Sequence, residues 1–269
     1  MCRSRVRDGD GGAVAEPEHG EGVLDRALRV LHCFSEDELE LTAAEIGRVT
    51  GLASSTLHRL LATLVERGLL ARVPGKRYVI GTRLWELGEL APVSVRLRER
   101  AIPHLLRLYE ATGENVHLAV LDGPSPAQST ALYVGRVTGR MSIPTVTRAG
   151  GQGPLHTTGV GKALLATRDE SWLAQYFTAP RPPETLHSVC DEGALRHEIV
   201  QTRDRGYATT REEMTLGNIS VAVALPVLDG LPPVALGLVV HLERADERHL
   251  ARLVAQAASE LTAALRDAR

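Results

Sequence analysis

The stretch GLASSTLHRLLATLVERGLLARVPGKRYVI, residues 51–80, joins a helical pattern to the pattern of a short β-hairpin. Four leucines recur at positions i, i+3, i+4 and i+7, the spacing of one buried helical stripe, and they predict a helix over 54–68: Leu57, Leu60, Leu61 and Leu64. The other side of its first turns is polar, with Ser54, Ser55, His58 and Arg59. Hydroxyl, imidazole and guanidinium groups can contact base edges in the major groove, so this pattern is typical of a recognition helix.

Upstream, the segment LTAAEIGRVTG at 41–51 carries both the start and the stop signals of another helix. Thr42 is placed to cap the helix, Glu45 completes a capping box, and Gly51 supplies a left-handed end. A further helix is predicted between 23 and 34, where apolar residues again fall at helical spacing: Leu24, Ala27, Leu28 and Leu31. Because only Leu52 and Ala53 separate the second and third helices, the segment predicts a helix-turn-helix.

Downstream, LLARV and KRYVI predict two short strands joined at Pro74-Gly75, which is the pattern of a wing. Lys76 and Arg77 lie at its expected tip, where a phosphate or minor-groove contact would be made. Residues 41–80 hold six basic and two acidic side chains, a local net charge of +4 in a chain of net charge −2. Such a basic surface is expected of a nucleic-acid-binding domain.

An alternative explanation of these residues is the solvated face of a plain helical hairpin. The wing and the local positive charge both favour a winged helix-turn-helix whose partner is double-stranded operator DNA. The candidate DNA-binding residues are Thr42, Ser54, Ser55, Thr56, His58, Arg59, Lys76 and Arg77.

The length of 269 residues predicts two domains. We expect a disordered arm at 1–22, the winged helix-turn-helix at 23–82, a linker helix at 83–94, and an effector-binding and oligomerisation domain at 95–269. The short helix around Trp85 is either a dimer contact or a plain linker packed on its own domain. Three widely spaced cysteines and the lack of a 20-residue apolar run favour a cytoplasmic protein that does not enter a membrane.

The second half alternates groups of strands with helices, which predicts an α+β domain built on a mixed sheet. A helix is expected at about 94–111, followed by strands in VHLAVLDG, TALYVGRVTG and MSIPTV. Helices are then expected at 158–168 and in ALRHEIVQTRDRGYA, a buried hairpin over VAVALPVLD and PVALGLVVHLE, and a closing helix from 246.

The segment LHTTGVGKALLA, residues 155–166, contains a Gly-Val-Gly-Lys step but is not a P-loop. His156 stands where the first glycine of G-x-x-x-x-G-K-[ST] belongs, and Ala163 replaces the required hydroxyl residue. Thr157 or Thr158 can cap a helix here, and the free N–H groups of its first turn would attract an anion. The segment is therefore an anion site or an ordinary capped helix. Lys162, one turn further on, is expected to form at most a surface ion pair.

An enzyme is the main rival class. The sequence contains no G-x-S-x-G elbow, no H-E-x-x-H and no G-x-G-x-x-G, and its ten histidines are scattered. We therefore expect no catalytic activity, no metal and no cofactor. A second rival is a DNA-binding regulator whose C-terminal part only oligomerises, without a ligand.

The chain resembles the IclR-type transcriptional regulators from about residue 23 onward. Three blocks carry the resemblance: GLASSTLHRLLATLVERGLL, LHTTGVGKALLA and RDRGYATTREEMTLGNISVAVALPV. It implies a winged-helix domain joined by a helix to a GAF/PAS-like effector domain. It also implies dimers that pair into tetramers on palindromic operators, and effectors that are small aliphatic or aromatic acids.

The resemblance further implies an effector site on the helix that begins near Thr158. Gly159 and Val160 match the positions whose backbone N–H groups bind an effector carboxylate. Thr210 stands where some members have an acidic residue, Ser220 where some have cysteine, and His241 matches a polar position on the last strand. The candidate effector-binding residues are Thr158, Gly159, Val160, Thr210, Ser220 and His241.

Overall fold

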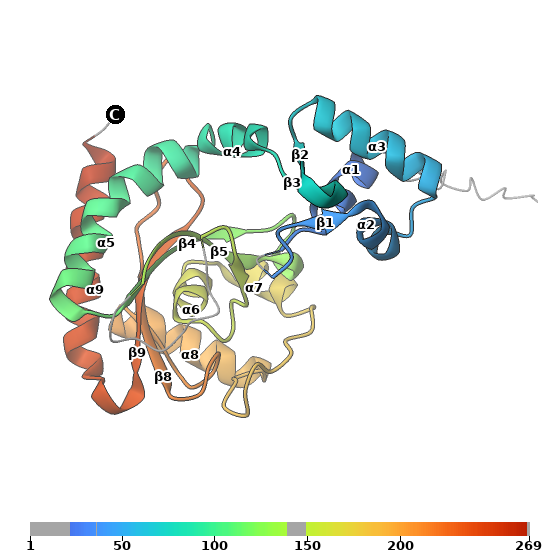
Figure 1. Cartoon of the computed structure of the whole chain (residues 1–269). Helices are drawn as coiled ribbons and strands as arrows, with labels where there is room; N and C mark the ends of the chain where they lie inside the picture. The colour runs from blue at the N-terminus through green and yellow to red at the C-terminus, as the bar shows by residue number, and fades with distance from the viewer. Residues whose placement is uncertain (1–21, 36, 139–148, 268–269) are drawn as a thin grey trace, which may run out of the picture. The chain divides into compact units, whose positions relative to one another are not determined.

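A computed structural model describes residues 22–35, 37–138 and 149–267, which form two compact units, one up to Gly88 and the other from Glu89 (Figure 1). The boundary falls inside the segment 83–94 that we expected to link two domains. The expected arm, apart from its last residue Gly22, and the strand expected in MSIPTV lie outside the described residues. No helix of the described ranges is both long and apolar enough to cross a membrane.

The N-terminal unit is a helix-turn-helix followed by a hairpin. Its elements are α1 (Val23–Leu31), β1 (Leu41–Thr42), α2 (Ala43–Thr50), α3 (Ser54–Glu66), β2 (Leu70–Val73), β3 (Arg77–Ile80) and α4 (Thr82–Glu89). The predicted capping box is confirmed: the Glu45 N–H donates to Thr42 Oγ1 (3.3 Å), and the Thr42 N–H donates to Glu45 Oε2 (2.7 Å). The predicted stop at Gly51 is also confirmed, with φ of 66°.

The core of this unit forms where the buried stripe of α3 meets α1, α2 and the sheet. The buried members include Val30, Ile46, Leu57, Leu61, Leu64, Leu70 and Tyr78. The sheet has the order β1-β3-β2 with antiparallel pairing, so β1 extends the hairpin. The turn of that hairpin needs two left-handed residues, Gly75 (φ 80°) and Lys76 (φ 59°), which glycine adopts without strain and lysine does not.

The C-terminal unit begins with an irregular helix. A π-helical turn (Val93–Arg98) runs into α5 (Glu99–Thr112), which contains Pro103. The remaining elements are β4 (Asn115–Asp122), β5 (Thr130–Val137), β6 (Gln152–Gly153), α6 (Gly159–Ala166), α7 (Glu170–Tyr176), α8 (Glu192–Arg205), β7 (Ala208–Arg211), β8 (Asn218–Ala224), β9 (Val234–His241) and α9 (Glu247–Arg266). The helices predicted near 94–111, 158–168 and 194–206, and the closing helix, are confirmed.

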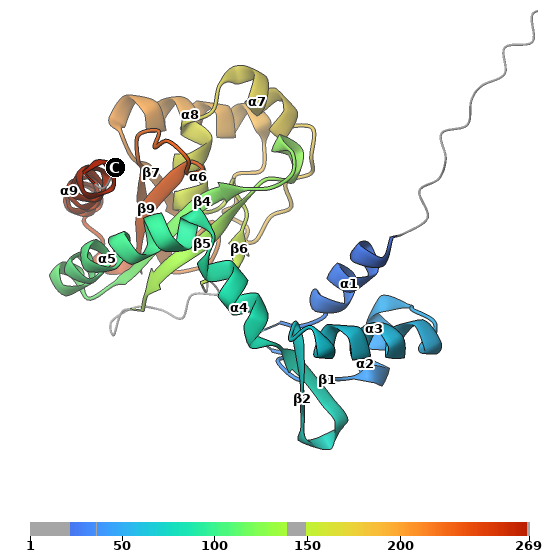
Figure 2. The ribbon, with the colours of Figure 1, turned by 90° about the horizontal axis from the view of Figure 1, so that it is seen from above.

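Six strands form one sheet in the order β6-β5-β4-β9-β8-β7, with α5 and α9 on one face and α6, α7 and α8 on the other (Figure 2). Every pairing between the described strands is antiparallel, so the expectation of a mixed sheet was wrong. The reason lies in the connections. β4 and β5 are consecutive in the chain and adjacent in the sheet, and so are β7, β8 and β9. Adjacent strands that are joined directly run antiparallel.

The two faces of the sheet differ in the size of their side chains. Along β9, Leu236, Leu238 and Val240 belong to the core beneath α5 and α9, whereas Ala235 belongs to the core beneath α6. A Cβ atom on Gly237 would lie 2.9 Å from the Cβ atom of Ala222 and 3.1 Å from Val160 Cγ1. Small residues on this face therefore let the first turn of α6 lie directly on the sheet.

Candidate functional site

The beginning of α6 presents backbone N–H groups to the sheet face. Thr158 is its N-cap: its hydroxyl accepts the N–H of Gly161 (3.1 Å) and donates to the carbonyl of Pro154 (2.7 Å). The first N–H groups of an α-helix have no intrahelical acceptor, and the cap has taken that of Gly161. The N–H groups of Gly159 and Val160 are therefore the donors of the first turn of α6 that remain available to a ligand.

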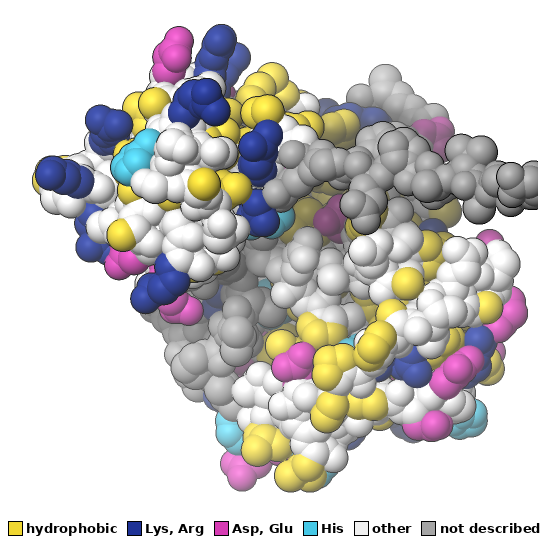
Figure 3. Space-filling model, turned by 90° about the vertical axis from the view of Figure 1, so that its right-hand side faces the viewer, with side chains coloured by type: hydrophobic (Ala, Val, Ile, Leu, Met, Phe, Trp, Pro, Cys, Tyr) yellow, Lys and Arg dark blue, Asp and Glu magenta, His cyan; other side chains and the backbone are white. Residues whose placement is uncertain are grey.

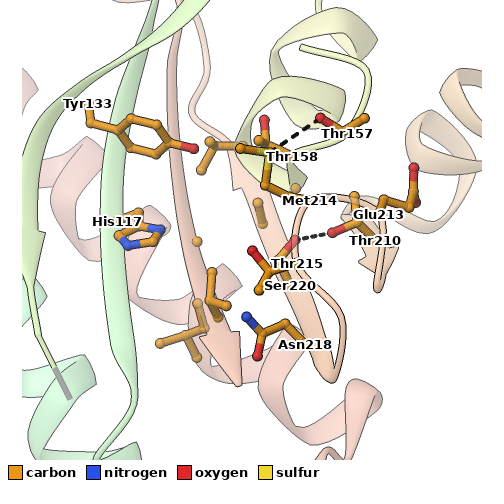
Figure 4. A pocket seen from close by; sticks show the side chains of 16 residues that line it. His117, Tyr133, Thr157, Thr158, Thr210, Glu213, Met214, Thr215, Asn218 and Ser220 are labelled. Carbon is orange, nitrogen blue, oxygen red and sulfur yellow. Dashed lines mark hydrogen bonds between the residues drawn. The ribbon is translucent and has the colours of Figure 1, made fainter. Parts of the chain in front are cut away.

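A cavity lies against this helix start, between α6 and strands β4, β5, β8 and β9 (Figure 4). The space between its lining residues amounts to about 560 Å³, including space that is open to solvent. Its walls are mostly apolar with a few polar groups, and the lining residues are His117, Tyr133, Thr157, Thr158, Gly159, Val160, Thr210, Glu213, Met214, Thr215, Asn218, Ser220, Ala222, Gly237, Leu238 and Val239.

Five of the six effector-site residues expected from the sequence line this one cavity: Thr158, Gly159, Val160, Thr210 and Ser220. Thr210 and Ser220 face each other across the β7–β8 pair, and their hydroxyls are hydrogen-bonded. Ser220 also supports the helix start, because a Cβ atom on Gly159 would lie 2.4 Å from Ser220 Oγ. Only glycine lets the first turn of α6 come this close to β8.

His241 is not among the residues that line the cavity, although it pairs with the lining residue Asn218 across β8 and β9, and its assignment stays a prediction. It is the last residue of β9, two residues beyond Val239, which is the last lining residue on that strand. Its Nδ1 atom accepts the N–H of Glu243 (3.3 Å) and so caps the following turn.

Several lining side chains were missed by the sequence reasoning, among them His117 on β4 and Tyr133 on β5. Their rings meet edge to face, with centroids 5.3 Å apart. Burial, with Arg136 nearby, lowers the pKa of His117 to about 3, so its imidazole is neutral at pH 7. Burial raises the pKa of Tyr133 to about 12, so its phenol keeps its proton. The available signal was a histidine within the apolar run VHLAVLD, which is an unusual place for that residue.

The depressed pKa of His117 predicts a loss of stability in acid. The folded-state pKa lies below the ordinary 6.5, so the stabilisation is present above pH 6.5 and is lost as the pH falls towards about 3. We expect His117 to account for a loss of about 2 kcal/mol in the free energy of unfolding between pH 7 and pH 5. The free energy of unfolding of His117→Gln should therefore fall by about 2 kcal/mol less than that of the native protein between pH 7 and pH 5.

The measurement is urea unfolding of the full chain in a Trp85→Phe background. Of the two tryptophans only Trp172 then remains, so fluorescence reports on the C-terminal unit. The contributions of the other histidines are the same in both proteins and cancel in the difference. Equal acid losses in the two proteins would contradict a neutral, buried His117.

Lys162 is not in a surface ion pair, which corrects our expectation. Its side chain is 1% exposed, and Nζ donates to both carboxylate oxygens of Glu213 (2.7 and 2.8 Å) and to Glu198. Glu213 is 5% exposed and also accepts the N–H of Val189 (3.3 Å). Burial raises the pKa of Glu213, and Lys162 opposes that rise. This buried cluster joins α6, α8 and the β7–β8 loop that closes the cavity.

The N-terminal unit exposes the predicted recognition face. Ser54, Ser55, His58 and Arg59 are all exposed on the first turns of α3, and Lys76 is exposed at the tip of the wing. Thr56 is half-buried, in a groove between α1 and α3. Figure 3, where Lys and Arg are dark blue, shows basic side chains spread over the exposed surface of this unit.

Two of the expected DNA-binding side chains are engaged within the domain. The Thr42 hydroxyl donates to Glu45 Oε2 (2.8 Å). Arg77 lies on β3 and donates to the Glu40 carbonyl (2.8 Å), and its guanidinium also pairs with the Glu40 and Glu45 carboxylates (3.6 and 3.9 Å). Arg77 is therefore less available than Lys76, whose side chain is exposed at the tip of the wing. Among the described side chains no group of three or more potential metal ligands is gathered in one place.

A winged helix-turn-helix beside a sheet-based unit with a cavity defines a ligand-responsive type of DNA-binding regulator. Residues 23–74 match the IclR helix-turn-helix domain, and residues 91–263 match the bacterial transcriptional regulator IclR C-terminal family. The chain belongs to the IclR family of transcriptional regulators, and this confirms the resemblance and the predicted fold class. The family consists of regulators, not enzymes, which excludes the catalytic alternative.

Individual relatives match over most of their length. The HTH-type transcriptional regulator XynR of Escherichia coli is 34% identical over 235 residues, covering 85% of this chain and 89% of the relative. The regulator BhcR of Paracoccus denitrificans is 33% identical over 267 residues, covering 97% of this chain and 93% of the relative. An IclR homolog from Microbacterium hydrocarbonoxydans, solved with 4-hydroxybenzoate, has a TM-score of 0.84 at 29% identity, covering 92% and 100% of the two chains.

Proposed function

We propose that this regulator adjusts its affinity for operator DNA in response to a small organic acid whose carboxylate sits on the first turn of α6. The observation that carries the proposal is the position of the cavity against the N–H groups of Gly159 and Val160. An anion there gains from both donors and from the helix dipole. The 4-hydroxybenzoate bound by the Microbacterium homolog is a carboxylate of suitable size, and this supports the same ligand class here.

Val160→Pro tests the carboxylate site. Val160 is the second residue of α6, where proline removes one N–H donor but keeps an apolar side chain against Gly237. A hydrogen bond to a charged group is worth about 1.5–3 kcal/mol, so affinity for 4-hydroxybenzoate should fall roughly 10- to 150-fold. Isothermal titration calorimetry on the full chain measures this directly.

The matched control is Gly193→Pro, which puts proline at the same position of α8, on an exposed residue outside the cavity wall. It should bind the acid as the native protein does. Undiminished binding by a folded Val160→Pro variant would place the carboxylate elsewhere. If the native protein binds neither 4-hydroxybenzoate nor any other acid in a panel, the C-terminal unit serves self-association alone.

We further infer that operator contacts come from the first turns of α3, through Ser54, Ser55, His58 and Arg59, and from Lys76 on the wing. Thr56, half-buried, is a secondary candidate. Thr42 and Arg77 contribute indirectly, by holding the start of α2 and the wing in place. Operator binding places the protein's action in the cytoplasm.

Self-association is part of the proposal, because one winged helix offers little surface for tight operator binding, and two half-sites read together bind far more tightly. Exposed apolar side chains lie on and just after α4: Trp85 is 68% exposed, and Leu87 and Leu90 are also exposed. Leu87, two residues after Trp85, lies on the opposite side of the helix, so the expected contact centres on Trp85. Tryptophan is a frequent anchor of protein–protein interfaces. We propose that a second copy of this chain covers Trp85.

Trp85→Ser should therefore weaken the dimer by about 2 kcal/mol or more, roughly 30-fold, as buried interface tryptophans do. Val227→Ser removes an apolar side chain of the C-terminal unit that is 84% exposed, and it is the control. Analytical ultracentrifugation across a concentration series gives the dissociation constants. A native species of 29.0 kDa at micromolar concentration would rule out the dimer, and an unchanged Trp85→Ser variant would move the interface away from α4.

The connector is the natural route from cavity to DNA-binding unit. Pro103 has no N–H to donate to the Glu99 carbonyl, and the preceding turn is π-helical, so the helix is irregular where the chain enters the C-terminal unit. A ligand alters DNA affinity only if it binds two arrangements of the protein differently. We propose that the segment 89–112 adopts those two arrangements.

A further inference from the structure

Asn218 is a polar side chain of the cavity wall whose buried carbonyl oxygen has no hydrogen-bond partner among the described residues. The residue is 7% exposed and lines the cavity, and its Oδ1 atom is buried without a hydrogen bond from any described residue. The hydroxyls of Thr158, Thr210 and Ser220 are all hydrogen-bonded within the wall. An unpaired buried amide oxygen destabilises a fold, so native proteins rarely keep one without a use.

The position of Asn218 relates it to the carboxylate site. It lies on β8 two residues before Ser220, so both side chains face α6, separated by roughly 6.8 Å along the strand. Ser220 lies under the helix start, in contact with Gly159. Figure 4 shows Asn218 on the far side of Ser220 from Thr158. A ligand anchored on α6 would reach Asn218 with its opposite end.

We propose that Asn218 is a specificity-determining residue that accepts a hydroxyl group on the end of the effector remote from the carboxylate. The effector class is then a hydroxy acid. This inference rests on the proposed carboxylate site. A hydroxyl suits an amide in either orientation, because it can donate to Oδ1 and also accept from the amide nitrogen. Figure 4 draws the amide nitrogen of Asn218 on the side of Ser220, so a ligand hydroxyl pairs Oδ1 when the amide is turned to exchange its oxygen and nitrogen. A second carboxylate or a ketone has no proton for Oδ1 in that orientation and would leave it unpaired.

The wall around Asn218 supports a hydroxyl rather than a charged group. Glu213 lines the same cavity, but its carboxylate is already paired with Lys162. The neutral His117 ring and the protonated Tyr133 phenol add no positive charge that would attract a second anion. A neutral hydroxyl needs no counter-charge and can pair the unpaired oxygen.

The test is calorimetry on the full chain with matched acids: benzoate against 4-hydroxybenzoate, and butyrate against 4-hydroxybutyrate. In at least one pair, the native protein should bind the hydroxy acid at least tenfold more tightly than its partner. Asn218→Leu, which keeps the branched shape and the number of side-chain heavy atoms, should still bind the plain acid and should lose the preference. The same variant should unfold at an equal or higher urea concentration without ligand, because it no longer buries an unpaired oxygen.

The outcomes separate this inference from the proposed function. One outcome would overturn the role of Asn218 alone: plain acids bind, Val160→Pro weakens that binding, and the native protein shows no preference for a hydroxyl. A hydroxyl preference that persists in Asn218→Leu would also overturn it. If no acid binds the native protein, both proposals fail.

Discussion

Lys162→Met should lower the free energy of unfolding of the C-terminal unit by about 3–5 kcal/mol, because it leaves the buried Glu213 carboxylate without a counter-charge. Glu198, at 30% exposure, can turn to solvent, whereas Glu213 cannot. Urea unfolding followed by Trp172 fluorescence in the Trp85→Phe background measures the change. A loss below about 1 kcal/mol would instead match a surface ion pair.

The control for this prediction is the double variant Lys162→Met with Glu213→Gln. Replacing both members of a buried pair by uncharged side chains costs much less than removing one partner. The double variant should therefore recover a large part of the lost stability. If its loss is as great as that of Lys162→Met alone, the cause is packing around Lys162 rather than the stranded charge.

Arg59→Ala should weaken binding to operator DNA by about 1–3 kcal/mol per half-site, and so by about 2–6 kcal/mol in a dimer that carries the change twice. Arg59 is exposed on the second turn of α3, where a recognition helix contacts base edges. Binding to scrambled DNA should change much less. Fluorescence anisotropy with both DNAs at fixed salt measures the two effects.

Two other basic residues serve as comparisons for Arg59. Arg67 ends the same helix and is exposed, so Arg67→Ala removes an equal charge away from the expected base contacts and should have little effect. Lys76→Ala should weaken binding to operator and scrambled DNA alike, because a phosphate contact carries no base information. If Arg59→Ala behaved like Lys76→Ala, the guanidinium would contact phosphate rather than a base.

Features encoded by neighbouring residues could be predicted from the sequence. The Thr42–Glu45 capping box, the stop at Gly51 and the cap at Thr158 each depend on residues within one turn of chain. The leucine stripe of α3 likewise follows from helical spacing alone. Signals of this kind placed the helix-turn-helix and the start of α6, and with it the end of the cavity that we propose binds an anion.

Features that depend on distant residues could not be predicted. Lys162 meets Glu198 and Glu213, which are 36 and 51 residues away, so nothing near the lysine indicated a buried cluster. Arg77 is neutralised by Glu40 across the β1–β3 pair, which only the fold brings together. His117 and Tyr133 reach the cavity through the β4–β5 register, which only the folded sheet sets.

The central claim is that an acid in this cavity changes operator affinity, and one titration tests it most directly. DNA from upstream of the protein's own gene is titrated with the full chain, with and without a panel of acids that includes 4-hydroxybenzoate. An acid that binds should shift the DNA dissociation constant of the native protein by roughly 5- to 150-fold, the usual range of such coupling. Val160→Pro should bind the same DNA without acid but show little shift. The account would be contradicted by an acid that binds the native protein and leaves its operator affinity unchanged. It would also be contradicted by an acid that shifts the DNA dissociation constants of the native protein and of Val160→Pro equally.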